Sequence, residues 1–302
     1  MKISGFKKRF FDTLEEEYPL EEVGSFFTIL AKEFTGMSRL EMALHPEKEL
    51  SPGELEKFED ALLRLSRHEP VQYITGKTEF FGLEFRVTKD VLIPRPETEE
   101  LVQWILEDLQ QKEKKDLKIL DIGTGSGCIA ISLAKNLPQA KVSAIDISEK
   151  ALKIAAENAA SNEVQVQLIE KDILGTAGLG EKYDLIVSNP PYVRELEKKD
   201  MQKNVLNYEP ATALYVKDLD PLIFYEKITA LAAHDLEPAG AVYFEINQYL
   251  GKETETLLRK KDFLTSLKKD IFGVDRMLKG VKHENYISYP LHQPTGGTTS
   301  VL

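Results

Sequence analysis

Hydrophobic and polar residues alternate at helical spacing over the first 70 positions of the chain. The recurring apolar residues are Phe6, Phe10, Phe11 and Leu14, and then Val23, Phe26, Phe27 and Leu30. This spacing is typical of amphipathic helices. A further helix is predicted after Ser51, an N-cap residue with Pro52 at the first helical position and Glu54 at the capping-box position. It ends before Pro70. We therefore predict a small helical bundle over residues 1–70, with the aromatic positions in its core.

A different pattern occupies residues 71–94. The strand-forming residues of this stretch are Tyr73, Ile74, Phe80, Phe81, Phe85 and Val87, and Gly76 and Gly82 interrupt them. The pattern predicts a β-hairpin that links two domains.

Beyond the hairpin, helical and strand patterns alternate along the chain. A helix over "RPETEELVQWILEDLQQKEKK" places Leu101, Val102, Ile105 and Leu109 on one face. Strands are predicted over "LKILDIG", "AKVSAIDI", "VQVQLIEKDI", "YDLIVSN" and "AVYFEIN", with helices between and after them. Such alternation predicts an α/β fold with a mostly parallel sheet and helices on both faces. We assign this domain to residues 95–290 and expect the polar, Gly-rich residues 291–302 to be disordered.

Composition narrows the classes of function. The 302 residues suggest two domains. The net charge of −11 argues against direct nucleic-acid binding, because such binding depends on clustered Lys and Arg. The single cysteine, Cys128, excludes an internal disulfide and a Cys-rich zinc cluster, and the five histidines show no HExxH spacing. We expect no metal site.

Two further features bear on location. No apolar run is long enough to cross a bilayer, and residues 1–19 turn acidic where a secretory signal needs an apolar stretch. We therefore expect a cytoplasmic protein that does not bind membranes, and a monomer.

The stretch "LDIGTGSGCIA" places Asp121, Gly123, Gly125 and Gly127 at a predicted strand-to-helix turn. In parallel sheets ligands bind at the carboxyl ends of the strands, and glycines let the backbone approach the ligand closely. The spacing is GxGxG, whereas the dinucleotide form GxGxxG would need glycine where Cys128 stands. The alternative is a turn in which the glycines serve packing only.

Acidic residues end the next two predicted strands. Asp146 can accept both hydroxyls of a ribose, and it would repel a 2′-phosphate. Asp172 is followed by Ile173, an acceptor beside an apolar side chain, which suits the amino group and ring face of an adenine. Alone, Asp146 is also a good residue for a helix N-terminus and Asp172 for a surface turn. Together with the glycine turn they favour an adenosine site.

The fourth strand runs into "NPPY", where two prolines cannot continue a central strand. Asn189 offers a carbonyl oxygen, and the rigid backbone of Pro190 and Pro191 can aim the Pro190 carbonyl at a fixed point. Two acceptors of this kind can bind both N–H groups of one planar NH2 group, and the ring of Tyr192 can cover the planar face of the group that carries it. Holding the N–H bonds directs the nitrogen lone pair and stabilises the positive charge that develops during attack. The alternative is a proline-stiffened loop with an asparagine turn cap.

An amide or aromatic amine is a poor nucleophile, so its partner must be a strong alkylating agent held in line. The sulfonium methyl of S-adenosylmethionine meets that need, and this donor carries the adenosine that the glycine turn favours. S-Adenosylhomocysteine would then be the product.

These residues resemble those of the class I methyltransferases, and more closely the bacterial peptide-chain release factor glutamine methyltransferases, the HemK family. The similarity covers nearly the whole chain, through "QYITGKTEFFGLEF", "LIPRPETEELV", "DIGTGSGCIAISLA", "VSNPPYV", "YEPATAL" and "FGVDRML" in that order. The resemblance implies a Rossmann-like domain with a seven-stranded sheet, and a helical domain at residues 1–70 that docks the release factor. It implies methylation of the side-chain amide nitrogen (N5) of the glutamine in the factor's GGQ motif.

The resemblance also implies roles for individual residues. The catalytic set would be Asn189, Pro190 and Tyr192. The cofactor set would be Asp121, Ile122, Gly123, Thr124 and Gly125 at the methionine moiety, Asp146 at the ribose, Asp172 and Ile173 at the adenine, and Asn189. The substrate set would be Asn189, Pro190, Pro191, Tyr192, Arg95 and Glu97. Two residues differ from the family pattern. Asn247 stands where the family usually has glycine, and Ile173 stands where some members have tryptophan.

Three other functions remain possible from the residues themselves. One is an amino-methyltransferase acting on a base of DNA or RNA, which would need base flipping and a basic cleft. Another is methylation of a glutamine in a ribosomal protein. The third is a binding module that keeps the adenosine pocket without catalysis, which would not require Asn189.

Overall fold

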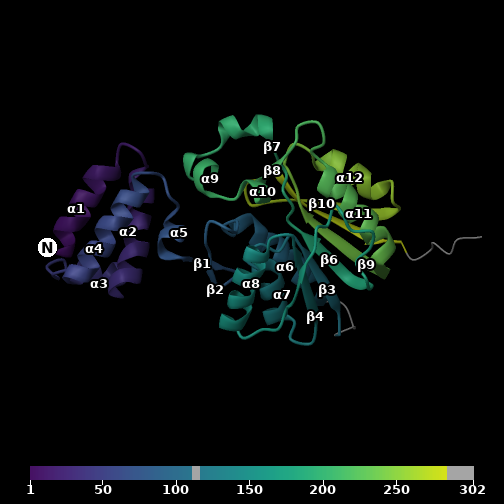
Figure 1. Cartoon of the computed structure of the whole chain (residues 1–302), viewed down its shortest axis with the longest axis horizontal. Helices are drawn as coiled ribbons and strands as arrows, with labels where there is room; N and C mark the ends of the chain where they lie inside the picture. The colour runs from purple at the N-terminus through teal and green to yellow at the C-terminus, as the bar shows by residue number, and fades with distance from the viewer. Residues whose placement is uncertain (111–115, 284–302) are drawn as a thin grey trace, which may run out of the picture.

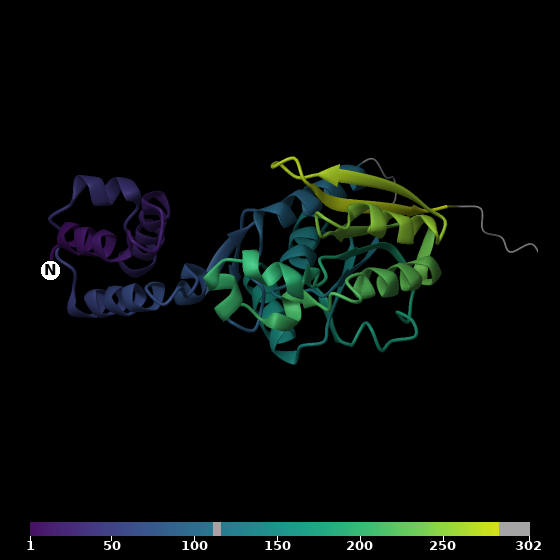
Figure 2. The same ribbon diagram turned by 90° about the horizontal axis from the view of Figure 1, so that it is seen from above.

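The N-terminal part of the chain is a bundle of short helices. A computed structural model describes residues 1–110 and 116–283. The bundle contains α1 (Ile3–Leu14), α2 (Leu20–Thr35), α3 (Arg39–Leu44) and α4 (Pro52–Leu65). Phe6, Phe10, Phe27 and Phe58 pack ring against ring in its core. Ser51 caps α4 in a capping box with Glu54, as the sequence predicted. In Figures 1 and 2 the bundle lies at one end of the molecule, next to the domain that contains the sheet.

The segment after the bundle differs in part from the prediction. Val71–Thr75 forms α5, so assigning Tyr73 and Ile74 to a strand was wrong. The Pro70 carbonyl accepts the backbone N–H groups of both residues, and Gly76 ends the turn in a left-handed conformation. Burial of the Tyr73 side chain, whose hydroxyl donates to the Val91 carbonyl, outweighs its preference for strands.

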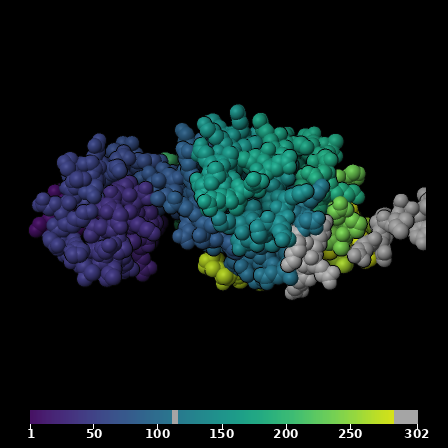
Figure 3. All heavy atoms as spheres, turned by 90° about the horizontal axis from the view of Figure 1, so that it is seen from below, coloured from purple at the N-terminus to yellow at the C-terminus, as the bar shows by residue number. Residues whose placement is uncertain are grey.

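The hairpin itself is confirmed. Strands β1 (Lys77–Phe80) and β2 (Leu83–Arg86) pair antiparallel. Phe81 and Gly82 connect them with φ values of 52° and 73°, which is the geometry of a type I′ turn. In the space-filling view of Figure 3 the bundle and the sheet domain form two masses, and this part of the chain lies where they meet.

The second part of the chain is built on a seven-stranded sheet, in agreement with the predicted α/β class. The strand order is β10-β11-β9-β6-β3-β4-β5. The strands are β3 (Lys118–Ile122), β4 (Lys141–Asp146), β5 (Gln167–Glu170), β6 (Tyr183–Ser188), β9 (Leu236–Glu245), β10 (Phe263–Lys269) and β11 (Asp275–Lys282). The first five in chain order run parallel, whereas β11 pairs antiparallel with both β9 and β10.

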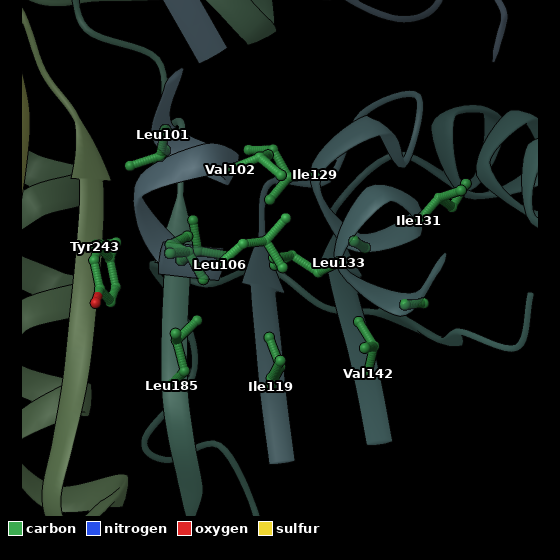
Figure 4. Packing of buried hydrophobic residues seen from close by; sticks show 14 of the residues in the cluster. Leu101, Val102, Leu106, Ile119, Ile129, Ile131, Leu133, Val142, Leu185 and Tyr243 are labelled. Carbon is green, nitrogen blue, oxygen red and sulfur yellow. The ribbon is translucent and has the colours of Figure 1, made fainter. Parts of the chain in front are cut away.

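Helices cover both faces of the sheet, as predicted. On one face pack α6 (Pro96–Gln110), α7 (Cys128–Asn136) and the end of α8 (Glu149–Ser161), and on the other α11 (Ile223–Asp235) and α12 (Gly251–Arg259). Figure 4 shows the first face, where residues of α6 and α7 lie against the strands; the labelled residues include Leu106, Leu133, Ile119, Val142 and Leu185. Each face therefore has its own apolar core.

An insertion between β6 and α11 was not predicted. It contains β7 (Val193–Arg194), the 3-10 helix η1 (Glu195–Asp200), α9 (Lys203–Tyr208), α10 (Ala211–Leu214) and β8 (Tyr215–Val216). In Figure 1 α9 lies between the bundle and the sheet domain. There the Tyr208 hydroxyl donates to the Arg67 carbonyl at 2.9 Å, and Lys203 lies 3.6 Å from Glu17. The insertion thus ties the two parts of the chain together.

The sheet order places a switch point beside β3. This strand has β4 on one side and β6 on the other, and the chain crosses over between them. Ligands bind at the carboxyl ends of strands at such a point. The Lys-rich end of the helix that precedes β3 and the predicted disordered tail lie outside the described residues. Within residues 1–110 and 116–283, no helix has the length and hydrophobicity that a bilayer crossing requires.

Candidate active site

The glycine turn after β3 contains two kinds of glycine. Gly123, Gly125 and Gly127 all have positive φ values, of 76°, 55° and 83°. A Cβ atom added at Gly127 would lie 2.8 Å from Ile131 Cδ1 and 3.2 Å from Ala155 Cβ, whereas at Gly123 or Gly125 it would meet no atom within 4 Å. Gly127 therefore serves close helix packing. Gly123 and Gly125 border open space, where a ligand can approach the backbone.

Asp121 lies beneath this turn and is fully buried. Its Oδ2 accepts a hydrogen bond from Thr124 Oγ1 at 2.6 Å, and burial raises the pKa of the carboxyl to about 7. The next residue, Ile122, is also buried, and its carbonyl accepts a hydrogen bond from Ser188 Oγ of β6. The ends of β3 and β6 are therefore joined directly at the switch point.

Asp146, the last residue of β4, fixes the glycine turn from the other side. Its Oδ2 accepts the backbone N–H of Gly125 and its Oδ1 accepts that of Ser148, both at 2.9 Å. The Ile145 carbonyl accepts from Gly123 and Thr124. The structure therefore brings Asp146 and the glycine turn together, and the carboxylate keeps further lone pairs for a ligand.

Asp172 and Ile173 follow β5 and lie in different environments. Asp172 is exposed, and its Oδ1 accepts the backbone N–H of Leu174 at 2.9 Å. Ile173 is 8% exposed and belongs to the apolar core that includes Ile145. Asp172 thus stands at a turn, while Ile173 offers a ligand only its outer edge.

The NPPY segment begins where β6 ends. Asn189 follows Ser188, which pairs with Ile122 of β3, so the segment emerges beside the glycine turn. Asn189 Nδ2 donates to Thr98 Oγ1 at 3.3 Å, and the Tyr192 hydroxyl donates to Glu245 Oε1 at 3.0 Å. Pro190 is buried and Pro191 half-buried. A cavity of about 40 Å³ lies here, lined by Leu92, Arg95, Asn189, Pro190, Tyr192, Val193, Ala213, Leu214 and Glu245. It has the size of a small polar group.

Arg95 and Glu97 flank the start of α6. Arg95 lines the cavity and is paired with Glu209, with Arg95 Nη2 2.6 Å from Glu209 Oε1. The Glu209 side chain is buried; burial raises the pKa of its carboxyl, and the charge of Arg95 opposes that rise. Glu97 is half-buried in the first turn of α6. The structure therefore brings Arg95 to the Asn189 cavity, which Glu97 does not line.

Two buried residues of the site were missed by the sequence analysis. Thr98 Oγ1 donates to Glu245 Oε2 at 2.6 Å, and these residues are 2% and 1% exposed. Burial raises the pKa of Glu245, while hydrogen bonds from Thr98 and Tyr192 and the charge of Arg276 oppose the rise. A glutamate at the end of the apolar run "AVYFEIN" was the available signal, because charged residues are buried only with partners.

Asn247, the departure from the family pattern, also has partners here. Its Nδ2 donates to the Tyr192 carbonyl and to Glu197 Oε2, each at 3.0 Å, and its Oδ1 accepts the backbone N–H of Tyr249. The side chain is 4% exposed. Asn247 thus anchors the backbone of the NPPY segment.

Two family models match this chain: the PrmC N-terminal domain over residues 8–76 and the methyltransferase small domain over residues 100–213. The release factor glutamine methyltransferase of Flavobacterium psychrophilum is 55% identical over 281 residues, which are 92% of this chain and 99% of that protein. The chain belongs to the release factor glutamine methyltransferase family. The relative from Bacteroides thetaiotaomicron is 46% identical over 88% of this chain and 95% of its own.

A solved structure shows the same fold at lower identity. The 16S rRNA N2 methyltransferase of Thermus thermophilus, solved with AdoMet and guanosine, has a TM-score of 0.50 and 19% identity, and the match covers 68% of this chain and 50% of that one. The chain is therefore a methyltransferase, as the sequence predicted, and membership of this family implies the use of S-adenosylmethionine.

Proposed function

We propose that this protein transfers the methyl group of S-adenosylmethionine to the side-chain amide nitrogen (N5) of the glutamine in the GGQ motif of peptide chain release factors. The observation that carries the proposal is the cavity that Asn189, Pro190 and Tyr192 line beside the glycine turn. Such a cavity suits one planar carboxamide. Family membership favours a protein glutamine over a base of DNA or RNA, and the net charge of −11 agrees with that preference.

The residues beside the switch point fit the cofactor. Gly123 and Gly125 leave open space along the backbone, and Asp146 stands next to them with lone pairs suited to ribose hydroxyls. We assign the methionine moiety to the turn from Asp121 to Gly125, including Ile122 and Thr124. We assign the adenine to Asp172 and the exposed edge of Ile173. When bound, S-adenosylmethionine supplies an activated methyl group on a sulfonium.

The chain's own residues supply orientation and electrostatic stabilisation. Because Asn189 Nδ2 faces Thr98, its Oδ1 is left to accept one N–H of the substrate amide, and the Pro190 carbonyl accepts the other. Two acceptors hold the nitrogen lone pair in one direction and stabilise the positive charge that grows on nitrogen. Burial raises the pKa of Tyr192, so its hydroxyl stays protonated and bonded to Glu245 while the ring borders the cavity.

Substrate contacts extend along the same rim. Arg95, held by Glu209, lines the cavity, whereas Pro191 follows the lining residue Pro190 in the chain and Glu97 stands in the first turn of α6. We assign these residues to substrate binding.

Docking of the release factor is assigned to the helical domain at residues 1–70, with residues 71–94 as the linker and residues 95–290 as the catalytic domain. Support comes from the match of residues 8–76 to the PrmC N-terminal domain. It also comes from an open groove of about 1170 Å³ on the bundle, whose lining includes Lys7, Lys8, Arg39, Phe11 and Met42. Three basic residues among mostly apolar and small lining side chains, with Glu21 the one acidic residue among them, suit a protein surface that carries acidic residues.

The test compares Asn189→Ala with wild-type protein, using purified release factor and radiolabelled methyl donor. Label should appear on the glutamine of the GGQ peptide in mass spectrometry. The substitution should lower kcat by about 10²–10³-fold, the loss typical of removing one preorganised electrostatic contact. Calorimetry should find cofactor affinity within a few-fold of wild type. Equal loss of both would contradict the role given to Asn189, and label on RNA or DNA instead of the factor would contradict the proposed function.

A further inference from the structure

A chain of hydrogen bonds runs from the protein core to the amide of Asn189. Tyr192 donates its hydroxyl to Glu245 Oε1 at 3.0 Å, and Thr98 donates its hydroxyl to Glu245 Oε2 at 2.6 Å. Asn189 Nδ2 in turn donates to Thr98 Oγ1 at 3.3 Å. The proposed function uses the Asn189 and Tyr192 ends of this chain, but it does not say what fixes the direction of the hydrogen bonds that Thr98 and Glu245 make between them.

We propose that Glu245 and Thr98 are positioning residues that fix which end of the Asn189 amide faces the substrate. The inference rests on the proposed function, because it concerns the acceptor that Asn189 presents to a substrate amide.

The argument depends on the direction of each hydrogen bond. Thr98 Oγ1 donates to Glu245 Oε2, so the hydroxyl hydrogen of Thr98 is committed to Glu245. The Thr98 oxygen then has only lone pairs to offer Asn189, and only the NH2 end of the amide can face it. The reverse orientation would set Asn189 Oδ1 against the Thr98 oxygen with no hydrogen between them. It would also present an NH2 group to the NH2 group of the substrate, so methyl transfer would lose an acceptor.

Burial makes this directional preference strong. Thr98 and Glu245 are 2% and 1% exposed, so water does not replace a missing partner there. The Thr98–Glu245 distance of 2.6 Å is at the short end of the range for O–H···O hydrogen bonds. Arg276 on β11, Glu97 on α6 and the hydroxyl of Tyr192 are the charged and titratable groups that act on Glu245. Thr98 sits in the first turn of α6 and Glu245 at the end of β9, so rigid elements hold both.

The central test is a pair of substitutions at Thr98. Thr98→Ser keeps the hydroxyl and should keep kcat within about threefold of wild type. Thr98→Val keeps the shape but removes the hydroxyl, and kcat should fall about tenfold or more, because small misplacements of a catalytic group cost up to about 10²-fold. Neither change should move the cofactor Kd by more than a few-fold in calorimetry, nor the KM for release factor.

A matched control lies in α11. Thr229 is 2% exposed and its hydroxyl has no hydrogen-bond partner among the described residues, so Thr229→Val makes the same chemical change at a buried position that does not line the cavity. It should leave kcat unchanged. Glu245→Gln keeps the shape of the Glu245 side chain, but its one remaining oxygen can replace only one of the two carboxylate oxygens that accept the hydroxyls of Thr98 and Tyr192. We therefore expect kcat to fall while cofactor affinity is unchanged.

The outcomes separate the inference from the function beneath it. Methylation by wild type and Thr98→Ser with loss in Thr98→Val supports the positioning role. Equal kcat in Thr98→Val and Thr98→Ser overturns it, as does a loss of cofactor binding parallel to the loss of kcat, which indicates a structural effect. Wild-type activity in Glu245→Gln removes Glu245 from the role. If wild type itself leaves the release factor unmethylated, the proposed function fails instead.

Discussion

Replacing Gly125 or Gly127 by alanine separates a ligand-facing glycine from a packing glycine in one turn. Both residues have left-handed backbone conformations, with φ of 55° and 83°. The added methyl group meets no atom within 4 Å at Gly125. At Gly127 it meets Ile131 Cδ1 at 2.8 Å and Ala155 Cβ and Cα at 3.2 and 3.4 Å.

The expected losses of stability follow from these contacts. A left-handed conformation costs an alanine about 1–2 kcal/mol, and both variants lose that amount. Gly127→Ala also overpacks a buried helix contact, because Ala155 lies in α8 and is fully buried; this adds about 1–3 kcal/mol. We therefore expect Gly125→Ala to lose about 1–2 kcal/mol of unfolding free energy and Gly127→Ala about 2–5 kcal/mol.

Cofactor affinity should show the opposite order. The methyl group added by Gly125→Ala would occupy the open space assigned to S-adenosylmethionine, so its Kd should rise at least about tenfold, or about 1.4 kcal/mol. The methyl group added by Gly127→Ala points into protein, so the Kd of that variant should change less. Urea unfolding without cofactor and calorimetric titration measure the two effects. Normal cofactor binding by Gly125→Ala would remove the turn from the cofactor site, and equal stabilities would refute the packing role of Gly127.

Two further predictions concern pH and docking. Burial raises the pKa of Asp121 from 3.8 to about 7, so the folded protein holds a proton that the unfolded chain releases above pH 3.8, and stability falls as pH rises towards 7. The shift of about three pKa units limits this loss of unfolding free energy to about 4 kcal/mol. Asp121→Asn should lack this part of the pH dependence of urea unfolding. Parallel plots of unfolding free energy against pH for the wild type and Asp121→Asn would disprove the prediction. On the bundle, the double change Lys8→Glu and Arg39→Glu should raise the KM for release factor about tenfold, equal to about 1.4 kcal/mol, with cofactor Kd unchanged. Lys57→Glu, on the same bundle but outside the groove, is the control, and an unchanged KM in the double variant would place docking elsewhere.

Periodicity predicted the parallel part of the sheet because β3, β4, β6 and β9 each contain a run of consecutive buried residues, and helical patterns alternate with these runs along the chain. It did not predict β10 and β11. Of β10 only Phe263 is buried, and β11 buries Met277 and Leu278 side by side, so neither strand shows regular alternation. Their strand form depends on pairing with β9, which is a tertiary property.

For the site, sequence reasoning located residues that directly follow strands, because parallel strands end at the same edge. Gly125 and Asp146 do meet there, through a hydrogen bond of 2.9 Å. The contact between Thr98 and Glu245 was out of reach, because these residues lie 147 positions apart and only folding brings their side chains together. The apolar run that ends at Glu245 was a signal for a buried carboxylate, but it did not identify the hydrogen-bond partners.

The register between β6 and β9 explains why the missed residues cluster. Ser188 pairs with Phe244 in parallel, so the NPPY segment after β6 and the residues after Phe244 leave the sheet side by side. Glu245 therefore reaches the hydroxyl of Tyr192, and Asn247, two positions further on, reaches its carbonyl. Residues at the end of β9 therefore contact Tyr192 at both its side chain and its backbone. A glycine at position 247 could not make the second contact, so in this chain the asparagine takes part in fixing the segment that presents Asn189.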